Sequence, residues 1–131
     1  KKISITTRIA FSQAMQNCFI MRVENEYIEN LWAEALKAFR KNNSYKFLLN
    51  AFPVFEKGLL LKYKNADEVE QDPKITIRNC INLLHQKELL DFDRDDVHEV
   101  WTYRNKRFHE GMELGQQDIK KIKEVIEAIL A

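Results

Sequence analysis

The chain has 131 residues, of which 45% are hydrophobic and 31% are charged, and its formal net charge is +1. This length suits one domain with a substantial core. The balanced charge excludes a uniformly basic nucleic-acid binder, so any RNA site has to be a local patch. No apolar run reaches the roughly 18 residues of a membrane span and no signal peptide is visible, so we expect a cytoplasmic protein without a membrane partner.

We interpret residues 1–131 as a single domain, and a longer parent protein remains open because the sequence begins with Lys-Lys rather than Met. Three Gly and two Pro are too few for the turns that connect the strands of a sheet, so the composition predicts an all-α fold. Cys18 and Cys80 stand alone, without a CxxC pair or a histidine at metal-ligand spacing, so we expect buried, reduced thiols and no metal site. No cofactor is expected. His85 and His98 have no motif around them and are interpreted as structural or solvated.

The first predicted helix starts at Thr6 or Thr7, which are suitable N-caps, and ends near residues 40–44. Its apolar positions recur every three or four residues: Phe11, Ala14, Met15, Cys18 and Phe19, then Ile28, Leu31, Trp32, Ala35, Leu36 and Phe39. Residues 22–26 (RVENE) are polar nearly all round. This predicts a bend or an exposed section within one long helix, or two helices in line.

The segment 45–64 is the most apolar of the chain and is predicted to form the central core helix. Pro53 lies inside it, which leaves open a kink or a break into two helices. An acidic loop follows, and Asp72 as cap with Pro73 in the first turn predicts a third helix that runs to about Glu88.

Asp93 is the predicted cap of the next helix, whose inner edge carries Val97, Val100, Trp101, Arg104 and Phe108. After Gly115 a last amphipathic helix is predicted, with Ile119, Ile122, Val125, Ile126, Ile129 and Leu130 inward. The chain as a whole therefore predicts an antiparallel bundle of about five helices.

Residues 101–111 (WTYRNKRFHEG) carry the residue types best suited to chemistry. Arg104 offers a permanent cation and a planar fork of donors for phosphate oxygens, and His109 can exchange a proton near neutral pH. Asn105 and His109 are four apart and share a helix face. Arg104 and His109 are roughly 140° apart on an ideal helix, so they meet most easily if the helix unwinds near Gly111.

Residues 104–109, an Arg-Asn-x3-His pattern near the end of a late helix, resemble the motif of the HEPN superfamily. Residues 55–63 look like the central Glu-Lys helix of that family and 75–90 like the helix before the motif, so the resemblance covers about residues 45–130. One toxin branch of the family continues His-x-Tyr and has that tyrosine modified by its antitoxin. Gly111 stands at that position here, which argues against this mode of regulation.

The resemblance implies a HEPN-like bundle and a metal-independent endoribonuclease with a toxin, phage-defence or RNA-processing role. Arg104, His109 and Asn105 would be catalytic, Lys106 and Arg107 would bind RNA, and no metal or cofactor is implied. Such cleavage needs a base for the 2′-hydroxyl and an acid for the leaving oxygen. Because each chain has one motif histidine, we expect a homodimer with the site at its seam. An antitoxin or regulatory domain is a further expected partner.

Two other functions stay open: a HEPN module without catalysis, used for dimerisation or for RNA or nucleotide binding with a partner, and a helical interaction domain whose motif is accidental. Arg104 and Asn105 can also satisfy helix-end carbonyls or pair with an acid such as Asp95 or Asp96. His109 can be a residue favoured by the negative end of the helix dipole.

Overall fold

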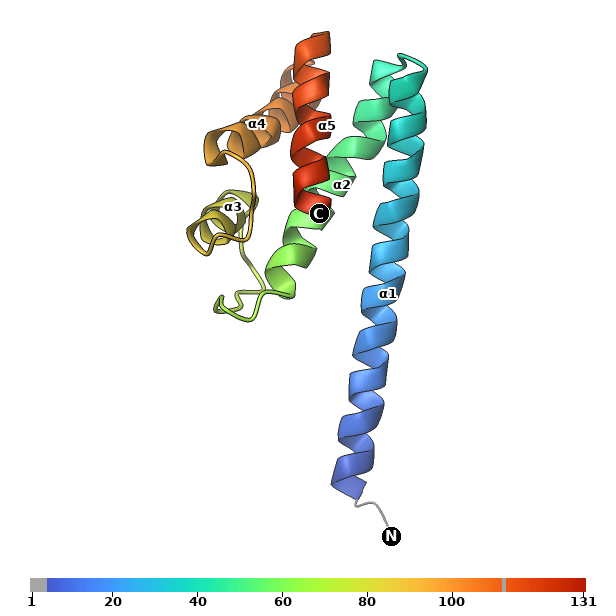
Figure 1. The fold of residues 1–131 in the computed structure, drawn as a ribbon, viewed down its shortest axis with the longest axis vertical. Coiled ribbons are helices and arrows are strands. Elements are labelled where there is room, and N and C mark those ends of the chain that lie inside the picture. Colours follow the sequence, from blue (N-terminus) through green and yellow to red (C-terminus); the bar gives the residue numbers. More distant parts are fainter. Residues whose placement is uncertain (1–4, 112) are drawn as a thin grey trace.

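The computed structural model describes the backbone of residues 5–111 and 113–131, and the side chains of residues 23–107, 111 and 113–131. Within these ranges the chain forms five α-helices: α1 (Ile5–Arg40), α2 (Ser44–Lys64), α3 (Ile77–Gln86), α4 (Arg94–Glu110) and α5 (Gln116–Leu130). The predicted all-α bundle of about five helices is confirmed (Figure 1).

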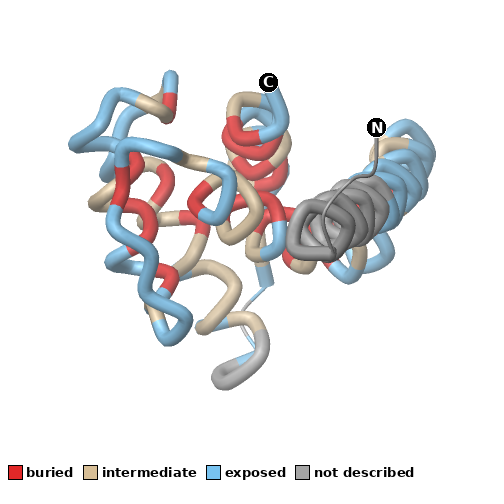
Figure 2. The backbone as a smooth tube through the Cα atoms, turned by 90° about the horizontal axis from the view of Figure 1, so that it is seen from below, coloured by how far each residue is buried: buried red, intermediate tan, exposed pale blue. Residues whose placement is uncertain are grey.

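The helix α2 is the centre of the bundle, because it packs against α1, α3 and α5, while α4 packs against α3 and α5. The largest fully buried side chains among the described residues come from α2 to α5: Phe47, Phe52, Val54, Phe55, Leu59, Ile81, Leu84, Val97, Val100, Ile122, Val125 and Ile126. Figure 2 shows these buried positions in the interior, with exposed positions around them. A Cβ on Gly58 would come within 3.2 Å of Ile129 Cγ2, so glycine permits the close packing of α2 on α5.

The helix α1 is continuous through residues 22–26, so the alternative of two separate helices is wrong. Val23, Asn25, Glu26 and Tyr27 are exposed, in agreement with the predicted exposed section. The helix continues because residues 5–40 contain no Gly or Pro. Its start at Ile5 places Thr6 and Thr7 inside the helix rather than at its cap.

Pro53 does not divide α2, which is one helix from Ser44 to Lys64. The residue four before it, Leu49, is half exposed, so water can reach the part of the helix where the proline leaves a carbonyl without its usual donor. Asn43 caps α2 by accepting a hydrogen bond from the Lys46 N–H at 3.1 Å.

The helix α3 starts at Ile77 and not at Pro73. Asp72 accepts a hydrogen bond from the Lys74 N–H at 2.9 Å and so closes a turn before the helix. Thr76 is the actual N-cap, since its Oγ1 accepts from the Asn79 N–H at 3.2 Å.

Cys80 is fully buried on α3, where its thiol lies 3.4 Å from the Leu59 carbonyl oxygen on α2. Burial raises the pKa of the Cys80 thiol to about 12. The thiol therefore stays protonated and packs as a small apolar group, as predicted. The side chain of Cys18 lies outside the described residues.

Candidate functional site

The helix α4, which carries the motif, begins and ends with well-formed caps. Asp93 Oδ1 accepts hydrogen bonds from the N–H groups of Asp95 at 2.9 Å and Asp96 at 3.2 Å, which confirms the predicted cap. Gly111 follows the helix with φ +65° and ψ 25°, the left-handed conformation that glycine adopts most easily. The helix therefore ends at a defined point, directly after the motif.

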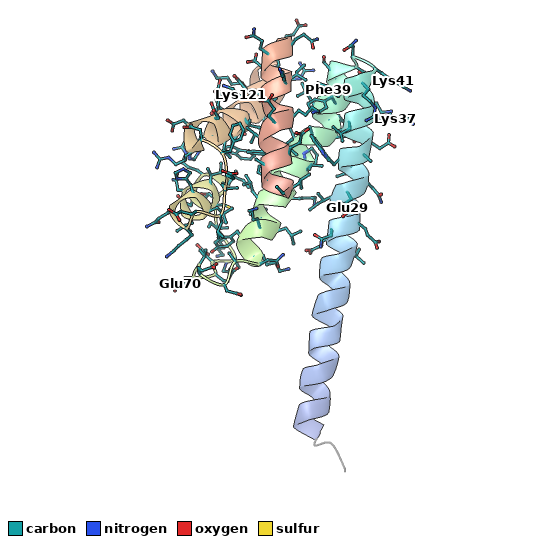
Figure 3. The ribbon with its side chains drawn as sticks, viewed as in Figure 1. Glu29, Lys37, Phe39, Lys41, Glu70 and Lys121 are labelled. Carbon is teal, nitrogen blue, oxygen red and sulfur yellow. The ribbon has the colours of Figure 1, made fainter. Side chains whose placement is uncertain are left out.

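A polar network fixes α4 against α5. The Tyr103 hydroxyl contacts Glu99 Oε1 and lies 3.0 Å from Asp118 Oδ1. The Lys121 ammonium lies 2.9 Å from Glu99 Oε2 and 3.2 Å from Asp96 Oδ1. Figure 3 labels Lys121 on α5, on the side of α4. These contacts orient the residue directly before Arg104, so they position the motif.

The network shifts the pKa values of its members. Hydrogen bonds from Tyr103 and Lys121 lower the pKa of Glu99, and hydrogen bonds to Glu99 and Asp96 raise the pKa of Lys121. Burial, with the two acceptor carboxylates, raises the pKa of Tyr103. All three shifts favour the charges that make the network, with Glu99 ionised, Lys121 protonated and Tyr103 a donor.

Glu99→Gln is expected to destabilise the fold at neutral pH by no more than about 1 kcal/mol, because the carboxylate is 40% exposed and screened by solvent. Because the pKa of Glu99 is lower in the folded protein, its ionised carboxylate adds to the free energy of unfolding at pH values above the ordinary pKa of a glutamate. This stabilisation is lost as the pH falls through the pKa that Glu99 has in the folded protein. Urea unfolding of both proteins at neutral and acidic pH measures the difference, which should disappear in acid. Glu124→Gln, at an exposed position of α5, is the control, and a difference independent of pH would contradict this assignment.

His98 joins α4 to α3, since its Nε2 lies 2.9 Å from Asn82 Oδ1. Burial, together with Arg78 and Arg94, lowers the pKa of His98. A neutral imidazole that links two helices agrees with the structural role expected for this residue.

Arg104 lies on an aromatic platform. Its guanidinium carbon is 5.1 Å from the centre of the Trp101 ring, and that ring is stacked on buried Phe55 with centroids 6.4 Å apart. One guanidinium nitrogen donates to Asn105 Oδ1 at 3.2 Å. The two motif residues thus contact each other, and the aromatic core below them limits the motion of the cation.

Arg104 also lines a cavity of about 280 Å³ against α2. The other lining residues are Phe52, Pro53, Glu56, Lys57 and Leu60. Glu56 and Lys57 are the pair in which the sequence resembles the central Glu-Lys helix of the HEPN superfamily. The fold therefore brings this pair and the motif arginine to one small cavity from residues about 47 apart in the chain.

Around this cavity, cations and half-exposed aromatic rings alternate on a surface that we call the α2–α4 face, formed by Tyr27, Tyr45, Lys57, Arg104 and Arg107. The Lys57 ammonium lies 5.3 Å from the Tyr27 ring centre, and the Arg107 guanidinium carbon lies 5.8 Å from that of Tyr45. Tyr27 is 50% and Tyr45 66% exposed. Each ring is therefore accessible to a ligand and also makes a cation–π contact with a basic side chain.

Sequence reasoning placed Arg107 in the site but missed Lys57, Tyr27 and Tyr45. On α2, Tyr45 and Leu49 are four residues apart and share a side, whereas Lys57 lies roughly 80° further round from Leu49. No local pattern shows that α4 and α1 approach these positions. Among the predicted RNA-binding residues, Lys106 is exposed and Arg107 is half-buried.

The backbone of His109 lies in the last turn of α4, and its side chain is outside the described residues. Helical structure continues through Glu110, so α4 lacks the unwinding that would let Arg104 and His109 meet most easily. Arg104 and His109 therefore lie about 140° apart on one continuous helix, whereas Asn105 and His109 lie on one face.

In the part of the chain that the structure describes, no group of three or more His, Cys, Asp or Glu residues could hold a metal ion. None of the helices described is both long and apolar enough to cross a membrane. Comparison of the chain with protein-family models, with curated proteins and with solved structures finds no match. The HEPN resemblance thus rests on the residues of this chain alone.

Proposed function

We propose that this chain is a metal-independent endoribonuclease of the HEPN type, with an active site completed across a homodimer. The observation that carries the proposal is the placement of Arg104, which rests on Trp101, contacts Asn105 and lines the same cavity as Lys57. A forked cation held beside a second cation suits a phosphodiester in which negative charge develops.

The proposed chemistry needs two groups that exchange protons and one cation. A base takes the proton of a ribose 2′-hydroxyl, whose oxygen attacks the adjacent phosphorus, and the bond from phosphorus to the 5′-oxygen breaks. An acid protonates that leaving 5′-oxygen, and the products are a 2′,3′-cyclic phosphate and a 5′-hydroxyl. His109 is the proposed proton carrier, and Arg104 stabilises the phosphate charge.

The continuous helix α4 supports a site shared by two chains. With Arg104 and His109 about 140° apart, one helix does not direct both residues at the same phosphate. A two-fold axis near the end of α4 supplies a second histidine and a second arginine from the other copy. Asn105 lies on the same face as His109 and orients the arginine that it contacts.

The α2–α4 face is the proposed path for the RNA on either side of the cut. Lys57, Lys106 and Arg107 neutralise phosphates, and the half-exposed rings of Tyr27 and Tyr45 accept stacked bases. Since the net charge of the chain is +1, these cations form the local patch that RNA binding requires.

A direct test incubates the purified protein with single-stranded RNA in EDTA. Cleavage is expected without metal, with a 2′,3′-cyclic phosphate on one product, and an oligonucleotide with a 2′-deoxy group at the cut should resist. Cleavage of the deoxy oligonucleotide at the same rate would exclude attack by the 2′-oxygen. An absence of cleavage with RNA still bound would favour the second candidate, a non-catalytic HEPN module, for which Arg104 and its Asn105 contact serve binding alone.

A further inference from the structure

The first part of α1 extends beyond the rest of the bundle. The helix α1 has 36 residues and α2 has 21, so at about 1.5 Å per residue α1 is longer by roughly 22 Å. Figure 1 shows α1 continuing past the ends of α2 and α5 toward the N-terminus. We call residues 5–22 the arm. Ile28 is the first buried residue of α1 among residues 23–40.

The arm has the composition of a helix that is covered by another surface. Its apolar residues are Ile5, Ile9, Ala10, Phe11, Ala14, Met15, Cys18, Phe19, Ile20 and Met21. An isolated helix of this length is only marginally stable in water, and most helical stability in proteins comes from packing of an apolar face. Packing of this apolar sequence on another surface would therefore stabilise the arm.

A groove of suitable character begins where the arm leaves the body. It has a volume of about 660 Å³ and lies between α1, the end of α2 and the end of α5. Its apolar lining consists of Ile28, Trp32, Ala33, Leu36, Leu61, Ala66, Leu89, Ile129, Leu130 and Ala131. Glu29, Asp67 and Glu68 add carboxylates, and Figure 3 labels Glu29 on α1 near the level where α5 ends.

The cation that lines the groove is already engaged. The Lys62 ammonium lies 3.4 Å from the carbonyl oxygens of both Ile129 and Ala131. The groove therefore combines an apolar floor with an acidic rim, which suits an apolar segment that carries positive charge.

Charge is segregated along α1 in a way that favours a second copy of this chain as the partner. The arm contains Arg8 and Arg22 and no acid. Residues 23–36 contain Glu24, Glu26, Glu29 and Glu34 and no Lys or Arg. Two copies of α1 placed antiparallel bring the basic arm of each beside the acidic section of the other, whereas a parallel pair places like charges together.

The spacing along α1 supports helix-to-helix packing on the groove side. Phe11, Cys18, Asn25 and Trp32 are each seven apart, as are Met15, Arg22, Glu29 and Leu36. Asn25, Glu29, Trp32 and Leu36 all line the groove. At the seven-residue period of a coiled coil, the arm positions Phe11, Met15 and Cys18 are therefore in register with these groove positions, and Arg22 is the charged member of the arm's two rows.

We propose that the arm of one chain lies antiparallel in the groove of a second copy, and that the second arm occupies the groove of the first. Such an exchange is isologous and two-fold symmetric. This exchange is separate from the dimer contact proposed above, which lies at the end of α4. The end of α4 is beside Tyr45 at the start of α2, and that end of the bundle is the one away from the arm (Figure 1). A chain that makes both contacts assembles beyond two copies.

The test uses two charge-reversal variants, Arg8→Glu with Arg22→Glu in the arm and Glu26→Lys with Glu29→Lys beside the groove. Sedimentation should show self-association of each variant weakened by at least about tenfold relative to wild type. An equimolar mixture of the two should recover wild-type association, because in the mixed pair each arm again meets a groove of opposite charge. Glu70→Lys, in the loop before α3 and labelled in Figure 3, should change nothing.

The recovery on mixing separates this proposal from misfolding and from the α4 contact, since neither predicts that two weakened variants repair each other. A wild-type protein that stays monomeric, variants that associate like wild type, or a mixture that does not recover would each overturn the exchange. RNA cleavage measured on the same samples reports the proposed function independently.

Discussion

Arg104→Ala is expected to slow RNA cleavage by about 10²- to 10³-fold, the loss that follows removal of one preorganised group from a developing charge. Arg104→Lys should recover little of this rate, because an ammonium lacks the planar fork that stacks on Trp101 and that, in the proposed mechanism, binds two phosphate oxygens. Single-turnover kinetics at saturating protein measures the chemical step apart from binding.

The control for this prediction is Lys106→Ala, two residues further along α4 and exposed. Loss of this phosphate contact should weaken RNA binding and its salt dependence while the single-turnover rate at saturation changes little. If Arg104→Lys cleaves as fast as wild type, the forked recognition of phosphate is wrong.

Phe55→Ala is expected to lower the free energy of unfolding by about 3–5 kcal/mol, the usual cost of removing a fully buried aromatic side chain. The ring is 0% exposed on α2 and stacks on Trp101 of α4, so its removal opens a cavity under the motif arginine. Since small domains are stable by only about 5–15 kcal/mol, this change alone brings the fold close to unfolding. Urea denaturation followed by circular dichroism measures it.

Phe55→Leu keeps most of the volume and should cost less than half as much as the alanine variant. A cost below about 1 kcal/mol for Phe55→Ala would contradict the central position of this ring in the core. Such a result would also remove the support assigned to Trp101 beneath Arg104.

The helices could be predicted from the sequence because their apolar residues recur every three or four positions. Val97, Val100 and Trp101 face the core side of α4 as expected, and Asp93 caps that helix. Helix boundaries were less predictable. Asp72-Pro73 has the chemistry of a helix start, but Thr76 provides a cap that also leaves Ile77 buried.

Only the part of the candidate site that lies within one segment of the sequence could be predicted. Arg104 and Asn105 belong to a local pattern, and the structure brings them into contact. Lys57 and Tyr45 join Arg104 and Arg107 only because α4 crosses α2, and periodicity on one helix does not reveal which helix will cover it. The groove between α1, α2 and α5 could not be predicted for the same reason, because its walls come from three helices.

The most direct measurement of the central claim compares wild type, Arg104→Ala and His109→Ala on one single-stranded RNA in EDTA, with folding of all three checked by circular dichroism. Cleavage by the wild type that is lost in both variants is the predicted result, because the mechanism needs the cation and the proton carrier together. Equal cleavage by all three proteins, or none by any, would contradict a ribonuclease built on Arg104 and His109.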